Sequence, residues 1–130
     1  MMQLPITQYA NVLVLQPEGR ITYLNALDFE ILLAPYIARC KQLAHPLLLD
    51  LQNLEYISSA GLRIFMLASK QLLPNGIKIA VANPQSIVRE ILEISRFNLI
   101  LPIYPSIADA LNALSANAHA EYEKSRLGND

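Results

Sequence analysis

Three short apolar runs, separated by longer amphipathic stretches, constrain the fold of this chain more than any other feature. The runs cover residues 11–16, 46–51 and 77–82 and are nearly continuous. Such runs are typical of buried strands. The stretches between them have apolar residues at helical spacing. The alternation of the two predicts an α/β domain.

The other predicted elements are less regular. Residues 3–8 and 99–104 form weaker candidate strands, and residues 19–22 are predicted as a loop. Asn25 and Asn83 are candidate helix N-caps, with Pro84 at the first position of its helix. Helices are expected from residue 25, at about 58–73, from 83 to about 94, and from 108 to about 124.

The first predicted helix contains an interior proline, Pro35. A proline there removes a backbone hydrogen bond, so a kink or a break into two pieces is expected near residues 31–35. Helical spacing directs four apolar side chains of this helix towards the core: Leu27, Ile31, Leu32 and Ile37.

Composition narrows the class of protein. With 130 residues, the chain fits one domain, 1–130, with an ordered core at about 3–124 and a polar tail at about 125–130. A hydrophobic content of 53% is sufficient for a full core. A net charge of −1 without a basic patch argues against nucleic acid as the main partner.

The cysteine content, the N-terminal residues and the length of the apolar runs predict the cellular location of the protein. The single cysteine, Cys40, is predicted as a small core or near-surface apolar residue at a helix end and fits a reducing compartment. The N-terminal residues do not resemble a signal peptide, and the apolar runs are far shorter than the ~20 residues of a membrane helix. The expectation is a cytoplasmic protein with no membrane partner.

A carboxylate and two serines form the most informative local pattern. Asp50 ends the second apolar run, and Ser58 and Ser59 begin the following helix. Ser58 is predicted to cap that helix, which leaves the Ser59 hydroxyl directed outwards. Asp50 has two possible roles: it orients the Ser59 hydroxyl, or it caps backbone N–H groups of the loop.

A helical projection separates two faces of this helix. Gly61, Phe65, Ala68 and Leu72 are assigned to the core. An exposed stripe is predicted on the other side, where a methionine suits a partner surface: Ser59, Arg63, Met66 and Lys70.

Enzymatic chemistry has little support in the sequence. His45 and His119 lie in no pattern that places them beside a serine, so a catalytic triad is not indicated. Four glycines form no phosphate-binding loop, and one cysteine with two distant histidines indicates no metal site. A receiver domain needs an acidic pair for Mg²⁺ after its first strand, whereas this chain has only Glu18 there. No enzyme activity and no cofactor are predicted.

The segment from Leu49 to Leu51, followed by Tyr56 to Arg63, resembles the STAS domain family, in particular its anti-sigma factor antagonists. The order of elements from about 11 to about 114 agrees. The resemblance implies one domain with a mixed four- to five-stranded sheet and about four helices packed largely on one face. It also implies two partners, an anti-sigma factor that is a serine kinase and a phosphoserine phosphatase, and it is compatible with a homodimer.

In that family, the unmodified antagonist binds the kinase and phosphorylation of a serine prevents binding. Alignment of Gly61-Leu62 with the family motif places the acceptor at Ser59. Many relatives have aspartate where this chain has Ser58, which makes Ser58 the alternative acceptor. The predicted partner-binding residues combine the start and exposed stripe of the helix at about 58–73 with the Arg20–Thr22 loop, the other candidate position of the interface: Arg20, Thr22, Ser58, Ser59, Ala60, Gly61, Arg63, Met66 and Lys70. The alternative function is a STAS scaffold or ligand-sensing module that is not phosphorylated.

Overall fold

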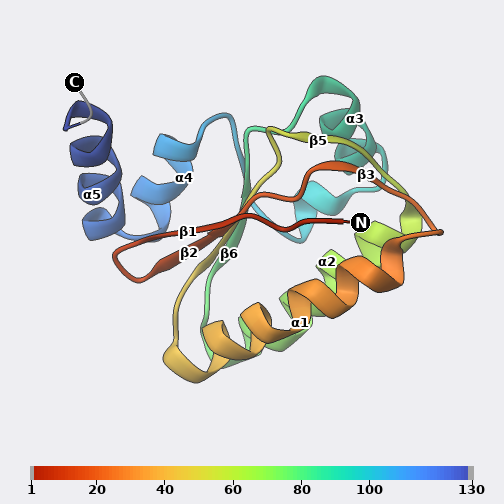
Figure 1. Cartoon of the computed structure of the whole chain (residues 1–130), viewed down its shortest axis with the longest axis horizontal. Helices are drawn as coiled ribbons and strands as arrows, with labels where there is room; N and C mark the ends of the chain where they lie inside the picture. The colour runs from red at the N-terminus through yellow and green to blue at the C-terminus, as the bar shows by residue number, and fades with distance from the viewer. Residues whose placement is uncertain (1, 129–130) are drawn as a thin grey trace.

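A five-stranded sheet forms the centre of the computed structural model, which describes residues 2–128 (Figure 1). Its strand order is β1-β2-β4-β6-β7. Only the β1–β2 pair is antiparallel, and the other pairs are parallel. The strands are β1 (Ile6–Tyr9), β2 (Val12–Leu15), β4 (Leu47–Asp50), β6 (Ile79–Ala82) and β7 (Ile103–Tyr104).

Two parallel strands outside this sheet were predicted as loops. β3 (Gly19–Ile21) pairs with β5 (Leu54–Ile57) in a separate two-stranded sheet. The prediction of a loop at residues 19–22 is therefore wrong. Both strands are short and only partly buried, so neither shows the continuous apolar run of β2 or β4.

Helices cover both faces of the central sheet. α1 and α2 lie along one face, and α4 and α5 lie on the other (Figure 1). The main core, defined here as the buried side chains under α1, α2 and α3, includes Phe29, Phe65 and Phe97. The smaller second core lies under α4 and α5 and contains Val14, Leu48 and Leu111. The helices are α1 (Ala26–Leu43), α2 (Ser59–Leu72), α3 (Ser86–Ile94), α4 (Ile107–Leu114) and α5 (Ala116–Leu127).

The α/β fold class and the mixed sheet of the predicted STAS-like domain are thus confirmed. Placing α4 and α5 on the opposite face refines the expectation that the helices lie largely on one face. Cys40 is fully buried in the main core, one of its two predicted positions, and burial raises the pKa of its thiol to about 11. Residues 129 and 130 of the predicted tail lie outside the described residues.

The first helix differs from its prediction in two respects. α1 runs through Pro35 without a break. The carbonyl of Ile31, which would accept from residue 35, lies on an exposed part of the helix where water can reach it. The buried side chains are Ala26, Phe29, Leu33, Ile37 and Cys40, so the assignment of Leu27 and Ile31 to the core is wrong.

Two later helix boundaries also differ. Asn83 adopts a left-handed conformation with φ of 56° and ends β6, so α3 begins only at Ser86. The predicted helix at 108–124 is two helices divided at Ser115, whose backbone is extended. The Ser115 hydroxyl oxygen accepts from the Ala118 N–H, and its O–H donates to the side-chain oxygen of Asn11, which ties the break to the β1–β2 turn.

α2 begins in close contact with the two-stranded sheet. Gly61 is buried, and a Cβ built on it would lie 2.6 Å from Cγ1 of Ile57 and 2.8 Å from Cγ2 of Ile21. These atoms belong to branched side chains close to their own backbone, so they cannot move away easily. The absence of a side chain at position 61 therefore sets how closely α2 approaches β3 and β5.

Gly61→Ala should lower the free energy of unfolding by about 1–3 kcal/mol, because overpacking outweighs the helix propensity gained by alanine. Urea unfolding followed by circular dichroism measures this change. Ser59→Ala, an exposed change two residues earlier, is the matched control and should stay within about 0.5 kcal/mol. An unchanged midpoint for Gly61→Ala would show that α2 can move away from the sheet.

Candidate functional site

Two serines with different environments begin α2. The Ser58 hydroxyl oxygen accepts from the Gly61 N–H at 3.3 Å, and its own N–H donates to the Ile21 carbonyl at 2.8 Å. Ser58 is thus the predicted N-cap and also links α2 to β3. Ser59 is exposed, and its hydroxyl makes no hydrogen bond within residues 2–128. The outward direction predicted for Ser59 is confirmed.

The stripe predicted on α2 is mostly exposed. Arg63 and Lys70 are exposed with Ser59, and Ala60 is half-buried beside them. Met66 differs, because it is half-buried and packs against the main core. The prediction that Met66 lies on the exposed stripe is therefore only partly correct. On the inner side, Phe65, Ala68 and Leu72 are buried as predicted.

A hydrogen-bonded turn follows β3 at residues 22–25. The Asn25 side chain accepts from the Thr22 N–H at 2.8 Å and donates to the Arg20 carbonyl at 2.8 Å. The Thr22 hydroxyl oxygen accepts from the Leu24 N–H at 3.2 Å. Asn25 precedes α1 but makes no side-chain cap, so its side chain holds this turn instead.

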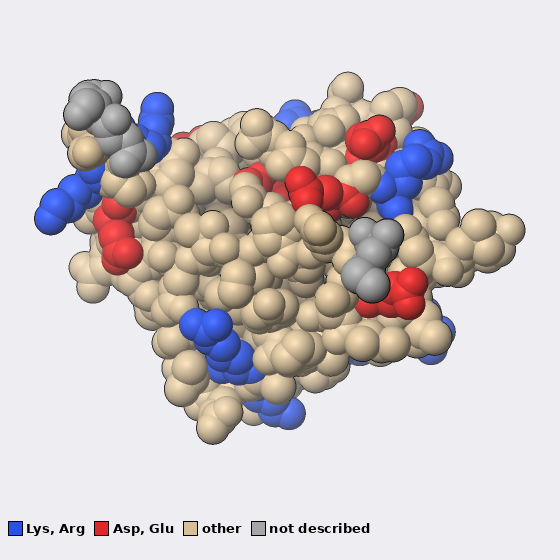
Figure 2. All heavy atoms as spheres, in the orientation of Figure 1, with Lys and Arg blue, Asp and Glu red and all other residues tan. Residues whose placement is uncertain are grey.

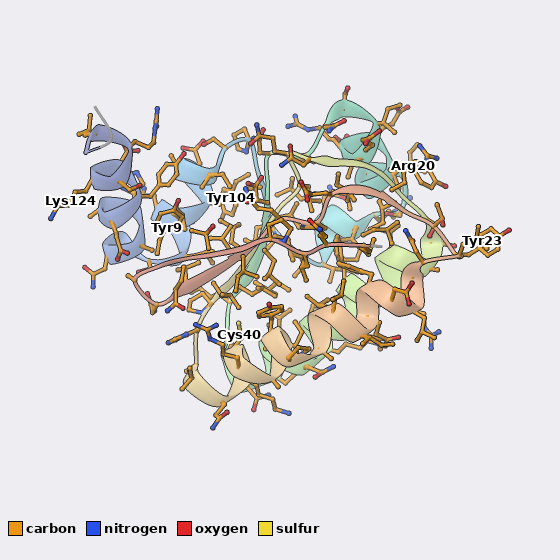
Figure 3. The ribbon with its side chains drawn as sticks, in the orientation of Figure 1. Tyr9, Arg20, Tyr23, Cys40, Tyr104 and Lys124 are labelled. Carbon is orange, nitrogen blue, oxygen red and sulfur yellow. The ribbon has the colours of Figure 1, made fainter. Side chains whose placement is uncertain are left out.

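The turn projects apolar side chains into solvent. Tyr23 and Leu24 are 79% and 78% exposed, and Leu27 and Ile31 on α1 follow at 67% and 62%. Figure 3 shows Tyr23 extending away from the body of the molecule near the N-terminal ends of α1 and α2. These four side chains are called the apolar patch below. Exposed apolar residues are usually scattered singly over a protein surface, whereas these four lie within one turn and the start of one helix.

A groove joins the apolar patch to the exposed stripe of α2. Its volume is about 210 Å³, and Leu27 and Glu30 of α1 face Ala60 and Arg63 of α2 across it. Ala60, which lines the groove, directly follows Ser59 in the chain, so the exposed serine is one residue from the groove lining. The sequence prediction included Ala60 and Arg63 but missed Leu27, which it placed in the core.

Arg20, the remaining predicted partner-binding residue, lies on β3. Its guanidinium carbon is 4.6 Å from the centre of the Tyr56 ring, a cation–π contact between the paired strands. Figure 3 places Arg20 on the same side of the molecule as Tyr23. On the face shown in Figure 2, Lys and Arg lie in small separate groups.

Asp50 lies apart from these residues. Alternation along β4 directs it to the same face as Leu48, which belongs to the second core. Its carboxylate accepts from the Gln16 side chain at 2.6 Å and from the Gln52 N–H at 3.1 Å. Of its two predicted roles, capping the loop fits this geometry and orienting Ser59 does not.

The described residues therefore form a small α/β domain with an exposed serine at a helix N-terminus, beside an apolar patch and a groove. Within residues 2–128, no group of three or more metal-ligating side chains is present, and no helix is long and apolar enough to cross a membrane. The model of the STAS domain matches residues 3–110, and the chain belongs to this family.

Known relatives agree with the family. BtrV of Bordetella bronchiseptica, which is assigned as an anti-sigma factor antagonist, is 33% identical over 102 residues, covering 78% of this chain and 85% of BtrV. An anti-sigma factor antagonist from Mycobacterium paratuberculosis has a TM-score of 0.77 at 23% identity, covering 88% of this chain and 94% of that structure. Unphosphorylated SpoIIAA, a Bacillus anti-sigma factor antagonist, has a TM-score of 0.66 at 13% identity, covering 87% of this chain and 95% of SpoIIAA. This chain has the anti-sigma factor antagonist type of STAS fold.

The two serines should respond differently to removal of their hydroxyls. Ser58→Ala loses the N-cap and should lower the free energy of unfolding by about 0.5–2 kcal/mol. Ser59→Ala should change it by less than about 0.5 kcal/mol, because no hydrogen bond is lost. Urea unfolding of both variants under one set of conditions makes the comparison. Equal effects would contradict the assignment of Ser58 as the cap.

Proposed function

We propose that this protein is an anti-sigma factor antagonist that binds an anti-sigma factor with serine kinase activity while Ser59 is unmodified. Phosphorylation of Ser59 ends the binding, and a phosphoserine phosphatase restores it. The observation that carries the proposal is the exposed Ser59 hydroxyl, which makes no hydrogen bond within residues 2–128 and lies one residue from the lining of the groove beside the apolar patch. The protein acts in the cytoplasm, through protein contacts rather than catalysis.

Ser59 is the better acceptor of the two serines. A kinase must reach the hydroxyl, and Ser59 is exposed whereas Ser58 is half-buried. Phosphorylation of Ser58 would also place a bulky phosphate on the oxygen that accepts from the Gly61 N–H. Ser58 therefore stays the structural cap, although many relatives have aspartate there.

A phosphate on Ser59 would change the surface more than the fold. It adds about −1.5 to −2 charges at neutral pH, close to free N–H groups and the positive end of the α2 dipole. Arg63 lies one turn further along α2, within reach of the phosphate. The modification thus places a hydrated dianion beside the groove and engages an arginine that a partner would otherwise contact. Both effects oppose docking while the helix stays intact.

The apolar patch supplies the attractive part of the interface. Aromatic side chains such as tyrosine often contribute most of the binding free energy at the centre of an interface, and the apolar side chains around them exclude water. The hydrogen-bonded turn at 22–25 holds the backbone that carries Tyr23 and Leu24, so this backbone loses little conformational freedom on docking. The relatives support the same type of partner, since BtrV and SpoIIAA are named as anti-sigma factor antagonists, and SpoIIAA has a phosphorylated form.

Ser59→Asp should weaken binding of the anti-sigma partner at least tenfold, because it places a negative charge beside the groove. Calorimetric titration with the purified partner measures the affinity, and Ser59→Ala should bind like the unmodified protein. The melting temperature of both variants should stay close to that of the native chain. Normal binding by Ser59→Asp would contradict the gating role of Ser59.

Leu27→Glu should weaken the same complex at least tenfold, because it puts a charge at the centre of the apolar patch. The matched control is Leu127→Glu on α5, where a leucine of similar exposure, 72% against 67%, lies far from α2 along the chain. Leu127→Glu should bind normally. Equal affinities for the two variants would place the interface elsewhere.

Phosphopeptide mapping of the protein from its native cells separates this function from the alternative. A single phosphate on Ser59 supports the switch. Protein that stays unmodified in several growth and stress conditions favours a STAS scaffold or ligand-sensing module, which acts by assembly, for example as a homodimer.

A further inference from the structure

A second cavity lies on the opposite face of the sheet from the apolar patch. Its volume is about 140 Å³, and it is a half-open pocket lined by residues of β1, β2 and β4, of the loops that follow β2 and β4, and of α4 and α5. A cavity of about 150 Å³ can hold a molecule of benzene size. The function proposed above does not use this cavity, although the buried carboxylate of Asp50 lines it.

Asp50 is a buried carboxyl group that has no cationic partner among the residues that the structure describes. It is only 2% exposed, and the ion pairs found within residues 2–128 do not include it. Its hydrogen bonds come from the neutral groups of Gln16 and Gln52. A carboxylate has about four acceptor positions, so further donors can bind. Because buried charges are usually paired, this carboxylate favours a ligand that brings a positive charge.

Two aromatic rings lie beside the carboxylate in the same cavity. Tyr9 of β1 and Tyr122 of α5 meet edge to face, with ring centres 5.3 Å apart. Tyrosine rings attract ammonium groups through their negative faces. The guanidinium carbon of Arg126 already lies 5.7 Å from the centre of the Tyr122 ring, at the outer side of α5.

The surrounding charges also favour a cation. Of the residues that line the cavity, none is Lys, Arg or His. Glu121 adds a second carboxylate at the edge, where it accepts from the Ala10 N–H at 2.7 Å. Burial and the neighbouring Tyr122 raise the pKa of the Tyr9 phenol, a hydrogen bond with Ser125 lowers it, and Glu121 and Asp50 raise it further.

We propose that this cavity binds a small organic ammonium compound of about five or six heavy atoms. Its ammonium group donates to Asp50, and its apolar part lies against Tyr9 and Tyr122. The donor set has one carboxylate and otherwise neutral groups, which suits an ammonium better than a metal ion.

Binding of this kind would tie α5 to the sheet. Tyr122 belongs to α5, whereas Asp50 belongs to β4, so one ligand contacts both. α5 lies beyond the matched STAS residues, 3–110, which means that the cavity is completed by a segment outside the family model. The site is therefore a property of this chain rather than of the matched domain alone.

The test is an NMR titration of the full chain with n-butylammonium chloride, and with n-butanol as the neutral molecule of the same size. We expect saturable shifts of β1, β4 and α5 signals with n-butylammonium, with a dissociation constant in the millimolar range or below. Butanol should bind at least tenfold more weakly. Asp50→Asn keeps the shape of the side chain, removes the charge, and should weaken n-butylammonium binding at least tenfold.

Tyr122→Leu is the second variant, because it leaves the sheet intact even if Asp50→Asn fails to fold. It should weaken n-butylammonium binding severalfold, whereas Ser59→Ala, on the other face, should not change it. The proposal is overturned if butanol binds as tightly as n-butylammonium, if Asp50→Asn and Tyr122→Leu bind normally, or if the shifts do not saturate by about 100 mM.

Discussion

The contact of Gly61 with Ile21 and Ile57 determines the arrangement of the whole region around Ser59. Without a side chain at position 61, α2 begins directly on the two-stranded sheet of β3 and β5. The hydrogen bond from the Ser58 N–H to the Ile21 carbonyl fixes the same junction. Ile21 also leads into the turn that carries Tyr23 and Leu24, so the serine and the apolar patch share one rigid support. A charge added at Ser59 therefore has a fixed position relative to the patch.

The two-stranded sheet of β3 and β5 is also the part of the fold that could not be predicted from the sequence. β2, β4 and β6 are buried at every position, which produces the apolar runs seen in the sequence. β3 and β5 have exposed or half-buried polar residues, and they pair across more than thirty residues of chain. The division of α4 from α5 likewise depends on the hydrogen bond of Ser115 to Asn11, a contact between residues 104 positions apart. Local patterns do not report such distant pairings.

The candidate site was predictable where local chemistry decides it. An N-cap at Ser58, an outward Ser59 and a core-facing Gly61 all follow from residues within one turn of α2. The apolar patch was missed because α1 has apolar side chains on two faces, and helical spacing alone does not decide which face is buried. Phe29, Leu33 and Ile37 lie against the sheet, which leaves Leu27 and Ile31 in solvent. The regular spacing of Phe29, Leu33, Ile37 and Cys40 in the sequence could have indicated which face of α1 is buried.

For Asp50, too, the sequence alone did not decide which face of its element the side chain is on. Its place at the end of β4 was clear from the sequence, but side chains of a strand alternate between faces, so a shift of one residue reverses the direction. Asp50 points to the second core, while Leu49 beside it points to the main core. The loop after β4 nevertheless connects Asp50 with α3. The Asp50 carboxylate accepts from the Gln52 N–H, and the Gln52 carbonyl accepts from the side chain of Gln85, just before α3. Leu54 then begins β5, which leads to Ser58. Any coupling between the ammonium cavity and the Ser59 site would have its shortest covalent route through this loop, and linkage requires such coupling to act equally in both directions.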